Sequence, residues 1–181
     1  MSSVPERSAI DEEYTWELES LFADDEWEAA FAEAESLVED LAAYEGRATD
    51  DGATLLETLE TYEDLMRTVA NVSAYARMRR DEDTTRDRYQ ALTARAQSLG
   101  ADASSAASFL EPAIQSLSRE AVDAMQESEP ALTEYDHYLD DVLRMKPHTR
   151  SAEVEELLAD LSEVTGGTGD VYTMLSNADM S

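Results

Sequence analysis

The chain has 181 residues, of which 43% are apolar, and it carries 42 Asp and Glu against 13 Lys and Arg, for a formal net charge of −29. This apolar content is enough for a compact core, and the absence of cysteine excludes disulfides, thiolate zinc sites and cysteine nucleophiles. A surface this acidic disfavours binding to nucleic acid or to an anionic membrane, because both begin with the neutralisation of phosphates by Lys and Arg.

The acidic residues are densest near the start, where residues 10–46 contain 14 acids and no basic residue, and Lys146 is the one lysine of the chain. Self-repulsion on this scale is screened at about molar salt, where the Debye length is about 3 Å. The composition therefore favours a halophilic protein adapted to a salt-rich cytoplasm, with an ordinary acidic protein as the alternative. A cytoplasmic location is expected, since no apolar stretch approaches the roughly 20 residues of a membrane span and residues 1–14 lack a signal-peptide core.

The first predicted helix follows Asp24 and Asp25, which form a good N-cap pair, and stops at Gly46. Its apolar residues recur at helical spacing and form one stripe: Trp27, Ala30, Phe31, Ala34, Leu37, Val38 and Leu41. A second helix is predicted to begin at Asp50-Asp51-Gly52 and to extend to about Arg80, or roughly eight turns.

A third helix is predicted to begin with Thr84 or Thr85 as its cap and to carry a heptad seam. The seam consists of Tyr89, Leu92, Ala96, Leu99, Ala103, Ala106 and Leu110. Small residues in its centre, among them Gly100 and Ala101, should let a neighbouring helix come close. Pro112 should kink or end this helix, because its ring displaces the backbone bond to residue 108.

Shorter helices are predicted beyond residue 117. Ser118 should cap a helix to about Glu127, Pro130 should break the chain, and Pro147 should separate a helix over residues 135–143 from one that begins after Ser151. No strand alternation and no fixed-period repeat is present. The prediction is an all-α helical bundle with two long antiparallel helices, divided into a long-helix part at 1–117 and a shorter-helix part at 118–181.

The two histidines, His137 and His148, do not form a convincing metal site. His137 shares a helical face with Asp141, but a catalytic zinc needs three protein ligands, and His148 lies beyond Pro147 on a different element. The sequence contains no H-E-x-x-H. We therefore interpret this stretch as a joint between helices, with Asp140, Asp141, Glu153, Glu155 and Glu156 as a solvated face, and we expect no catalytic, cofactor-binding or metal-binding residue in this chain.

Other motifs also have simpler explanations. The basic concentration is interleaved with acids and favours intramolecular pairing, although docking of an acidic segment or a substrate carboxylate stays open. Its members are Arg77, Arg79, Arg80, Arg86, Arg88 and Arg95. Tyr135 and Tyr138 could bind a peptide backbone but are more typical of core residues with a wet tip. The stretch Gly166-Gly167-Thr168-Gly169 lacks the strand and the lysine of a phosphate-binding loop.

The order of segments resembles the N-terminal region of oligoendopeptidase F, a zinc metallopeptidase of the thimet-oligopeptidase-like group. Four segments carry the resemblance: EYTWELESLFADDEWEAAF at 13–31, YARMRRDEDTTRDRYQAL at 75–92, YDHYLDDVLRMKPHTRSAEVEELLADL at 135–161 and MLSNADMS at 174–181. They occur in the order of the family and cover essentially the whole chain. Thr149-Arg150 departs from the family, which tends to have an apolar residue before the serine that corresponds to Ser151.

The resemblance implies a non-catalytic part of a peptidase hydrolase that cleaves short oligopeptides inside a channel. In the family, zinc is held by the two histidines of H-E-x-x-H and a downstream glutamate, and none of these can be carried onto a position of this chain. The resemblance thus implies that these helices form the wall and lid of the channel, that zinc is held by a C-terminal catalytic domain, and that the chain alone does not cleave peptides. The alternative is a free-standing acidic helical module that binds another protein.

Overall fold

The computed structural model describes residues 10–23 and 26–146. It divides into two compact units, Met1–Asp136 and His137–Ser181. Within the described residues the regular structure is helical and contains no strand, which confirms the predicted all-α class. The predicted boundary between residues 117 and 118 lies inside the first unit and stays a prediction.

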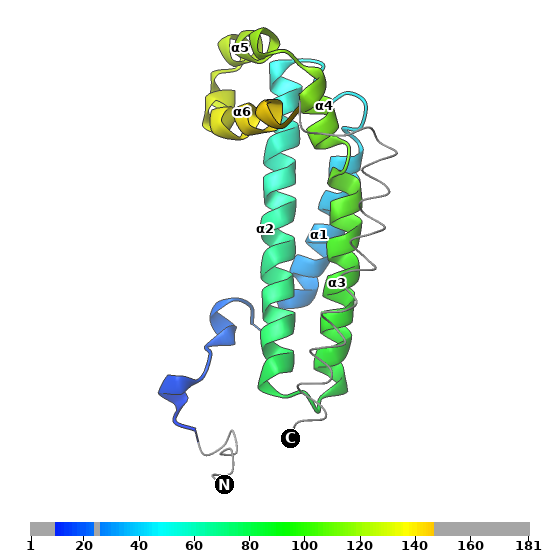
Figure 1. Ribbon diagram of the computed structural model, residues 1–181. Helices are drawn as coiled ribbons and strands as arrows, with labels where there is room; N and C mark the ends of the chain where they lie inside the picture. The colour runs from blue at the N-terminus through cyan, green and yellow to red at the C-terminus, as the bar shows by residue number, and fades with distance from the viewer. Residues whose placement is uncertain (1–9, 24–25, 147–181) are drawn as a thin grey trace. The chain divides into compact units, whose positions relative to one another are not determined.

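Three helices form the body of the first unit: α1 (Glu26–Ala42), α2 (Gly52–Glu82) and α3 (Asp87–Ala107). Figure 1 shows α2 and α3 side by side and antiparallel, with α1 against them. Helix α2, at 31 residues, is the long helix that the sequence predicted. Asp51 caps it by accepting a hydrogen bond from the Thr54 amide at 2.8 Å.

The core of this body is built from the predicted apolar stripes. It is formed by Trp27, Phe31, Ala34 and Leu41 of α1, Leu65, Val69, Val72, Tyr75 and Ala76 of α2, Leu92, Ala96, Leu99 and Ala103 of α3, and Leu18. The indole Nε1 of Trp27 donates to the carbonyl of Val72 at 3.0 Å, so the largest core side chain leaves no polar atom unsatisfied. The heptad seam of α3 is therefore buried inside this chain.

The turn between α2 and α3 corrects one prediction. The N-cap of α3 is Arg86, not Thr84 or Thr85, and it makes no side-chain cap. The carboxylate of Asp83 accepts hydrogen bonds from the amide and hydroxyl of Thr85, at 3.1 and 2.6 Å. Thr85 thus belongs to the turn that Asp83 stabilises, one residue before the N-cap position.

The small residues in the centre of α3 correct part of a second prediction, although Ala107, another member of this set, does pack against the core. Gly100 was expected to admit a close neighbour, yet a Cβ built at this position meets no described atom within 4 Å. Ala101 and Ser104 are exposed. The close approach occurs elsewhere, at Gly52, where a Cβ would lie 2.8 Å from the carbonyl oxygen of Met125.

The shorter elements follow the predicted breaks. Helix α3 ends at Ala107, and α4 (Leu110–Ser116) contains Pro112 in its first turn. The Ser118 hydroxyl caps α5 (Arg119–Ser128) by accepting from the Ala121 amide at 3.2 Å. Pro130 then starts the 3₁₀ helix η4 (Pro130–Tyr135), which packs with α5 against α2.

Two short 3₁₀ helices precede the body, η2 (Glu12–Tyr14) and η3 (Leu18–Ser20), and α6 (Asp136–Met145) follows η4. The predictions for the Asp24–Asp25 cap, for Pro147 and His148, for the helix after Ser151 and for Gly166–Gly169 lie outside the described residues. None of the helices in the described part of the chain combines the length and the apolar content that crossing a bilayer requires.

Candidate functional site

The arginines singled out by the sequence gather where α2 ends and α3 begins. Arg77, Arg79 and Arg80 lie on α2, Arg86 lies in the connecting turn, and Arg88 and Arg95 lie on α3. The antiparallel arrangement of α2 and α3 brings them to one end of the helix pair (Figure 1). Their partners divide them into a structural group and a group that lines a groove.

Arg79 belongs to the structural group. Its side chain is only 13% exposed, and its guanidinium binds the carboxylates of Glu19 and, at 3.1 Å, Glu82. It also lies 5.1 Å from the centre of the Tyr75 ring. Partial burial acts to lower the pKa of Arg79, but hydrogen bonds to Glu19, Tyr75 and Glu82 outweigh burial and hold the pKa above its usual value. This residue fastens the segment around η3 to α2.

Arg95 fastens α3 to α1 in a similar way. Its two terminal nitrogens donate to the two carboxylate oxygens of Glu28 at 2.8 and 2.9 Å. The same guanidinium lies over the rings of Trp27 and Phe31, at 4.9 and 4.3 Å from their centres. Arg86 pairs with Asp83 at 3.0 Å within the turn. Intramolecular pairing, the simpler of the two predicted roles, is confirmed for these arginines.

A groove between α2 and α3 is lined by Arg77 and Arg80 of α2. It consists of adjoining hollows of about 250 and 410 Å³ that share Arg80, Thr93 and Gln97, and the larger one also includes Arg77. The other described lining residues are Ala, Ser, Thr and Gln. No described residue that lines either hollow is acidic, although the chain has 42 carboxylates. We call this feature the arginine groove.

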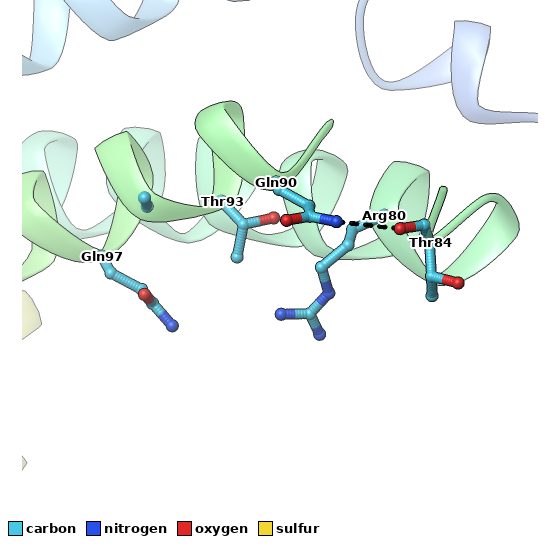
Figure 2. Close-up of a pocket in the computed structure, with 6 residues that line it drawn as sticks. Arg80, Thr84, Gln90, Thr93 and Gln97 are labelled. Carbon is cyan, nitrogen blue, oxygen red and sulfur yellow. Dashed lines mark hydrogen bonds between the residues drawn. The ribbon is translucent and has the colours of Figure 1, made fainter. Parts of the chain in front are cut away.

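The two cations of the arginine groove are only partly used within the fold. Arg80 donates from Nε and Nη2 to a single oxygen of Asp81, its neighbour in sequence, at 3.3 and 3.0 Å. Arg77 is exposed and forms no ion pair with another described residue. Figure 2 shows the Arg80 guanidinium and the Gln97 amide on the same side of the helices. Apart from Asp81, no described carboxylate pairs with Arg77 or Arg80, so the groove presents unused hydrogen-bond donors.

The amides and hydroxyls of the groove were missed by the sequence reasoning. Gln90 donates to the carbonyl of Thr84 at 2.9 Å and closes the hairpin end of the groove (Figure 2). The hydroxyl of Thr93 is buried and donates to the Tyr89 carbonyl at 2.9 Å, with the Ala76 carbonyl of α2 at 3.2 Å. The signal was present: residues 90, 93 and 97 recur at helical spacing beside the heptad seam.

The metal hypothesis concerned His137, which lies on α6 with its side chain 93% exposed. Its Nε2 lies 3.6 Å from the Asp141 carboxylate, and Arg144 donates to the same carboxylate at 2.9 Å. Hydrogen bonding from Arg144 is the main cause that lowers the pKa of Asp141. Among the described residues, no group of three or more His, Asp and Glu could hold a metal ion. The donors present there do not fit a catalytic zinc.

Tyr135 is a half-buried residue with a polar tip, as the sequence predicted. Its hydroxyl hydrogen-bonds the Glu63 carboxylate of α2 at 3.1 Å. Burial and then this carboxylate raise the pKa of Tyr135 to about 12. The hydroxyl thus stays protonated and donates to Glu63. This contact links η4 to α2, which is a structural role.

Comparisons with known proteins support the resemblance. A family model described as oligopeptidase F matches residues 114–181. The chain is 38% identical over 175 residues to the Group B oligopeptidase PepB of Streptococcus agalactiae, covering 96% of this chain and 29% of that protein. It is 33% identical over 181 residues to oligopeptidase PepF of Bacillus subtilis, covering 99% of this chain and 27% of that protein.

The fold is similar to a solved structure as well. Oligoendopeptidase F from Enterococcus faecium superposes with a TM-score of 0.71 at 31% identity, over 87% of this chain and 31% of that one. The chain therefore spans less than a third of the length of each of these proteins. The matched part is their N-terminal region.

Proposed function

Because the chain belongs to the oligoendopeptidase F family and corresponds to the non-catalytic N-terminal region of its members, we propose that it forms a wall of the channel in which a zinc-dependent oligopeptidase binds short peptides. The observation that carries this proposal is the alignment of nearly the whole chain with the N-terminal part of oligopeptidases that are more than three times as long. In this proposal the helices bind and orient a peptide and take no part in bond cleavage.

Zinc is proposed to belong to a catalytic domain that carries H-E-x-x-H, where it would supply an activated water. The described residues supply no suitable zinc ligands, and the sequence of this chain has no such motif. The proposed partners are that catalytic domain and short oligopeptides. A cytoplasmic location and adaptation to high salt complete the proposal and are supported by the composition alone.

A surface suited to contact the catalytic domain lies on the segment before α1. Four large apolar side chains there are exposed: Ile10, Tyr14, Trp16 and Leu21. A second contact predicted from the sequence is the apolar face near Leu175 together with the seam of α3. Leu175 lies outside the described residues, and the seam residues Leu92, Ala96, Leu99 and Ala103 are buried in the core. The exposed aromatic residues Tyr14 and Trp16 are the better candidates, since such residues dominate the energetics of interfaces.

A chimera tests the proposal. This chain would replace the aligned N-terminal region of the Streptococcus agalactiae oligopeptidase, and hydrolysis of a short peptide would be compared with that of the same enzyme lacking the region. We expect the chimera to cleave the peptide in a chelator-sensitive manner and the deletion variant to be at least about tenfold less active, as expected when substrate positioning is lost.

Two results would contradict the proposal. A deletion variant as active as the chimera would show that these helices are not needed, and would favour the free-standing acidic module. Chelator-sensitive cleavage by the purified 181-residue chain alone would show that the catalytic residues lie in this chain and not in a separate catalytic domain.

The chain alone is expected to retain less than about a tenth of a zinc ion per molecule after desalting, because three ligands cannot be assembled.

A further inference from the structure

The arginine groove lacks an anion of its own, in a chain where anions are abundant. Acids outnumber bases by 42 to 13, yet no described residue that lines the groove is acidic. The groove between α1 and α3, of similar size, is lined by Glu35, Glu39 and Asp102. The absence of acids in the arginine groove is thus a local feature of α2 and α3.

The unused donors of the groove suit a carboxylate. Arg80 uses Nε and one N–H of Nη2 on Asp81, which leaves both N–H groups of Nη1. Arg77 lies three residues earlier, on the same face of α2, and lines the same hollow. Guanidinium groups bind carboxylates through paired, charge-assisted hydrogen bonds. Gln97, which lines both hollows, adds an uncharged amide on the opposite helix.

The rest of the groove has the dimensions of a short peptide. Its floor is made of small side chains, Ala70 and Ala74 on α2 and Ala96 on α3. From residue 70 to residue 77 a helix rises about 10 Å, which is the length of about three extended residues. The larger hollow, about 410 Å³, lies in the range of sites that hold small ligands.

We propose that the arginine groove binds the C-terminal carboxylate of an oligopeptide, with Arg77 and Arg80 on the carboxylate and the preceding residues along the alanine floor. The identification of the ligand as a peptide rests on the proposed function, whereas the preference for a carboxylate rests on the groove itself. A terminal carboxylate is favoured over an acidic side chain because the alanine floor lies to one side of the arginines, and on their other side the hydrogen bond from Gln90 to Thr84 closes the hairpin end of the groove.

A titration followed by ¹H–¹⁵N NMR tests this site. The probe is the peptide Ala-Ala-Leu-Ala with a free C-terminus, added to the full chain at the lowest KCl concentration at which it is folded. We expect saturable shifts of the amides of Ala74, Ala96 and Gln97. The same peptide with a C-terminal amide should bind at least about tenfold more weakly, because charge-assisted hydrogen bonds are lost.

Matched variants locate the effect. Arg77→Gln/Arg80→Gln should weaken binding of the free peptide at least about tenfold. Arg47→Gln/Arg67→Gln removes the same two charges from exposed positions outside the groove and should leave binding unchanged. None of the four positions is buried, and glutamine is a good helix former, so both variants are expected to fold, which circular dichroism would verify.

Three outcomes would overturn the inference: equal binding of the amidated peptide, equal loss in the two variants, or shifts away from the groove. An amidated peptide that binds only when it carries a Glu side chain would assign the groove to acidic side chains instead. The result is separable from the chimera experiment. An inactive chimera with intact, arginine-dependent binding would refute the channel role alone, and an active chimera without such binding would refute this site alone.

Discussion

The two grooves that flank α3 share a helix and differ in charge. The arginine groove, between α2 and α3, is lined by Arg77 and Arg80 and no described acid, whereas the groove between α1 and α3 is lined by Glu35, Glu39 and Asp102 and no described base. We call the second the acidic groove. The larger hollow of the arginine groove, about 410 Å³, and the acidic groove, about 440 Å³, are nearly equal in volume. The two grooves therefore differ in the charge of their lining residues and not in size.

This difference shows that a chain with an acidic composition can still have a local surface without acidic residues. The α1 side of the acidic groove lies within the stretch of residues 10–46 that has 14 acids and no base. The arginine groove lies between α2 and α3, the two helices that carry half of the arginines in the chain. The acidic side should account for solubility and salt response, and the arginine side for recognition of an anion. Each role can be tested separately.

The largest expected effect concerns salt and the acidic side. Between about 0.1 M and about 1 M KCl the Debye length falls from about 10 Å to about 3 Å, which screens the repulsion of a net charge of −29. We expect the melting temperature to rise by about 10 °C over this range, equivalent to about 3 kcal/mol for a chain of this size. Circular dichroism melts across the range measure it. A constant melting temperature would show that the acids are too dispersed to repel one another and would end the halophilic interpretation.

The next effect concerns Arg95, which crosses from α3 to α1 beside the acidic groove. Arg95→Gln removes the bidentate pair with Glu28 and the stacking on Trp27 and Phe31. We expect a loss of about 1 to 2 kcal/mol in the free energy of unfolding, most of it from the rings, since exposed ion pairs contribute little. Urea unfolding measures it.

Arg88→Gln is the control for Arg95→Gln, because it removes the same charge from an exposed position two turns earlier on α3. It should cost less than about 0.5 kcal/mol, as surface substitutions usually do. Equal losses in the two variants would mean that net charge, rather than the contact with α1, determines the effect of Arg95.

A smaller effect is expected from the acids of the acidic groove itself. Glu35 and Glu39 are both exposed and lie one turn apart on α1, where like charges repel. Glu35→Gln/Glu39→Gln should stabilise the chain by about 0.5 kcal/mol at low salt and by almost nothing at molar salt. The control, Glu12→Gln/Glu13→Gln in η2, removes the same two charges outside this groove. The same gain in both variants would show that the groove concentrates no repulsion.

The helices were predictable from the sequence because their determinants are local. The stripe of α1, the cap Asp51, the cap Ser118 and the break at Pro130 all depend on residues within about one turn of each other. The predicted cap of α3 was wrong because the turn held by Asp83 places the start of the helix one residue later, at Arg86, and periodicity does not fix such a boundary.

The candidate site was only half predictable. That Arg77 and Arg80 share a face follows from their spacing of three residues. That Arg79 leaves this group could not be predicted, because its partner Glu19 is 60 residues away in the sequence. The absence of acidic residues from the lining of the groove also depends on which face of α3 packs against α2. A charge pattern identifies candidates, and tertiary packing determines which of them remain available to a ligand.

The smallest expected effect concerns pH and Glu28, the acid of α1 that pairs with Arg95. The hydrogen bond from Arg95 is the main cause that holds the pKa of Glu28 below its ordinary value of 4.5, against a weak opposing effect of burial. A carboxyl whose pKa is lowered by folding stabilises the folded state above its unfolded pKa and loses this contribution as pH falls through its folded pKa. Glu28→Gln should therefore cost a few tenths of a kcal/mol above about pH 5, since the pair is exposed to solvent, and nothing near pH 3. Urea unfolding between these pH values, at about 1 M KCl to suppress long-range repulsion, measures the difference.

The control is Glu33→Gln, at an exposed position on the same helix that forms no ion pair with another described residue. Its effect on the free energy of unfolding should not change between these pH values. If the two variants follow the same pH profile, the Glu28–Arg95 pair contributes no more to stability than an unpaired acid of α1.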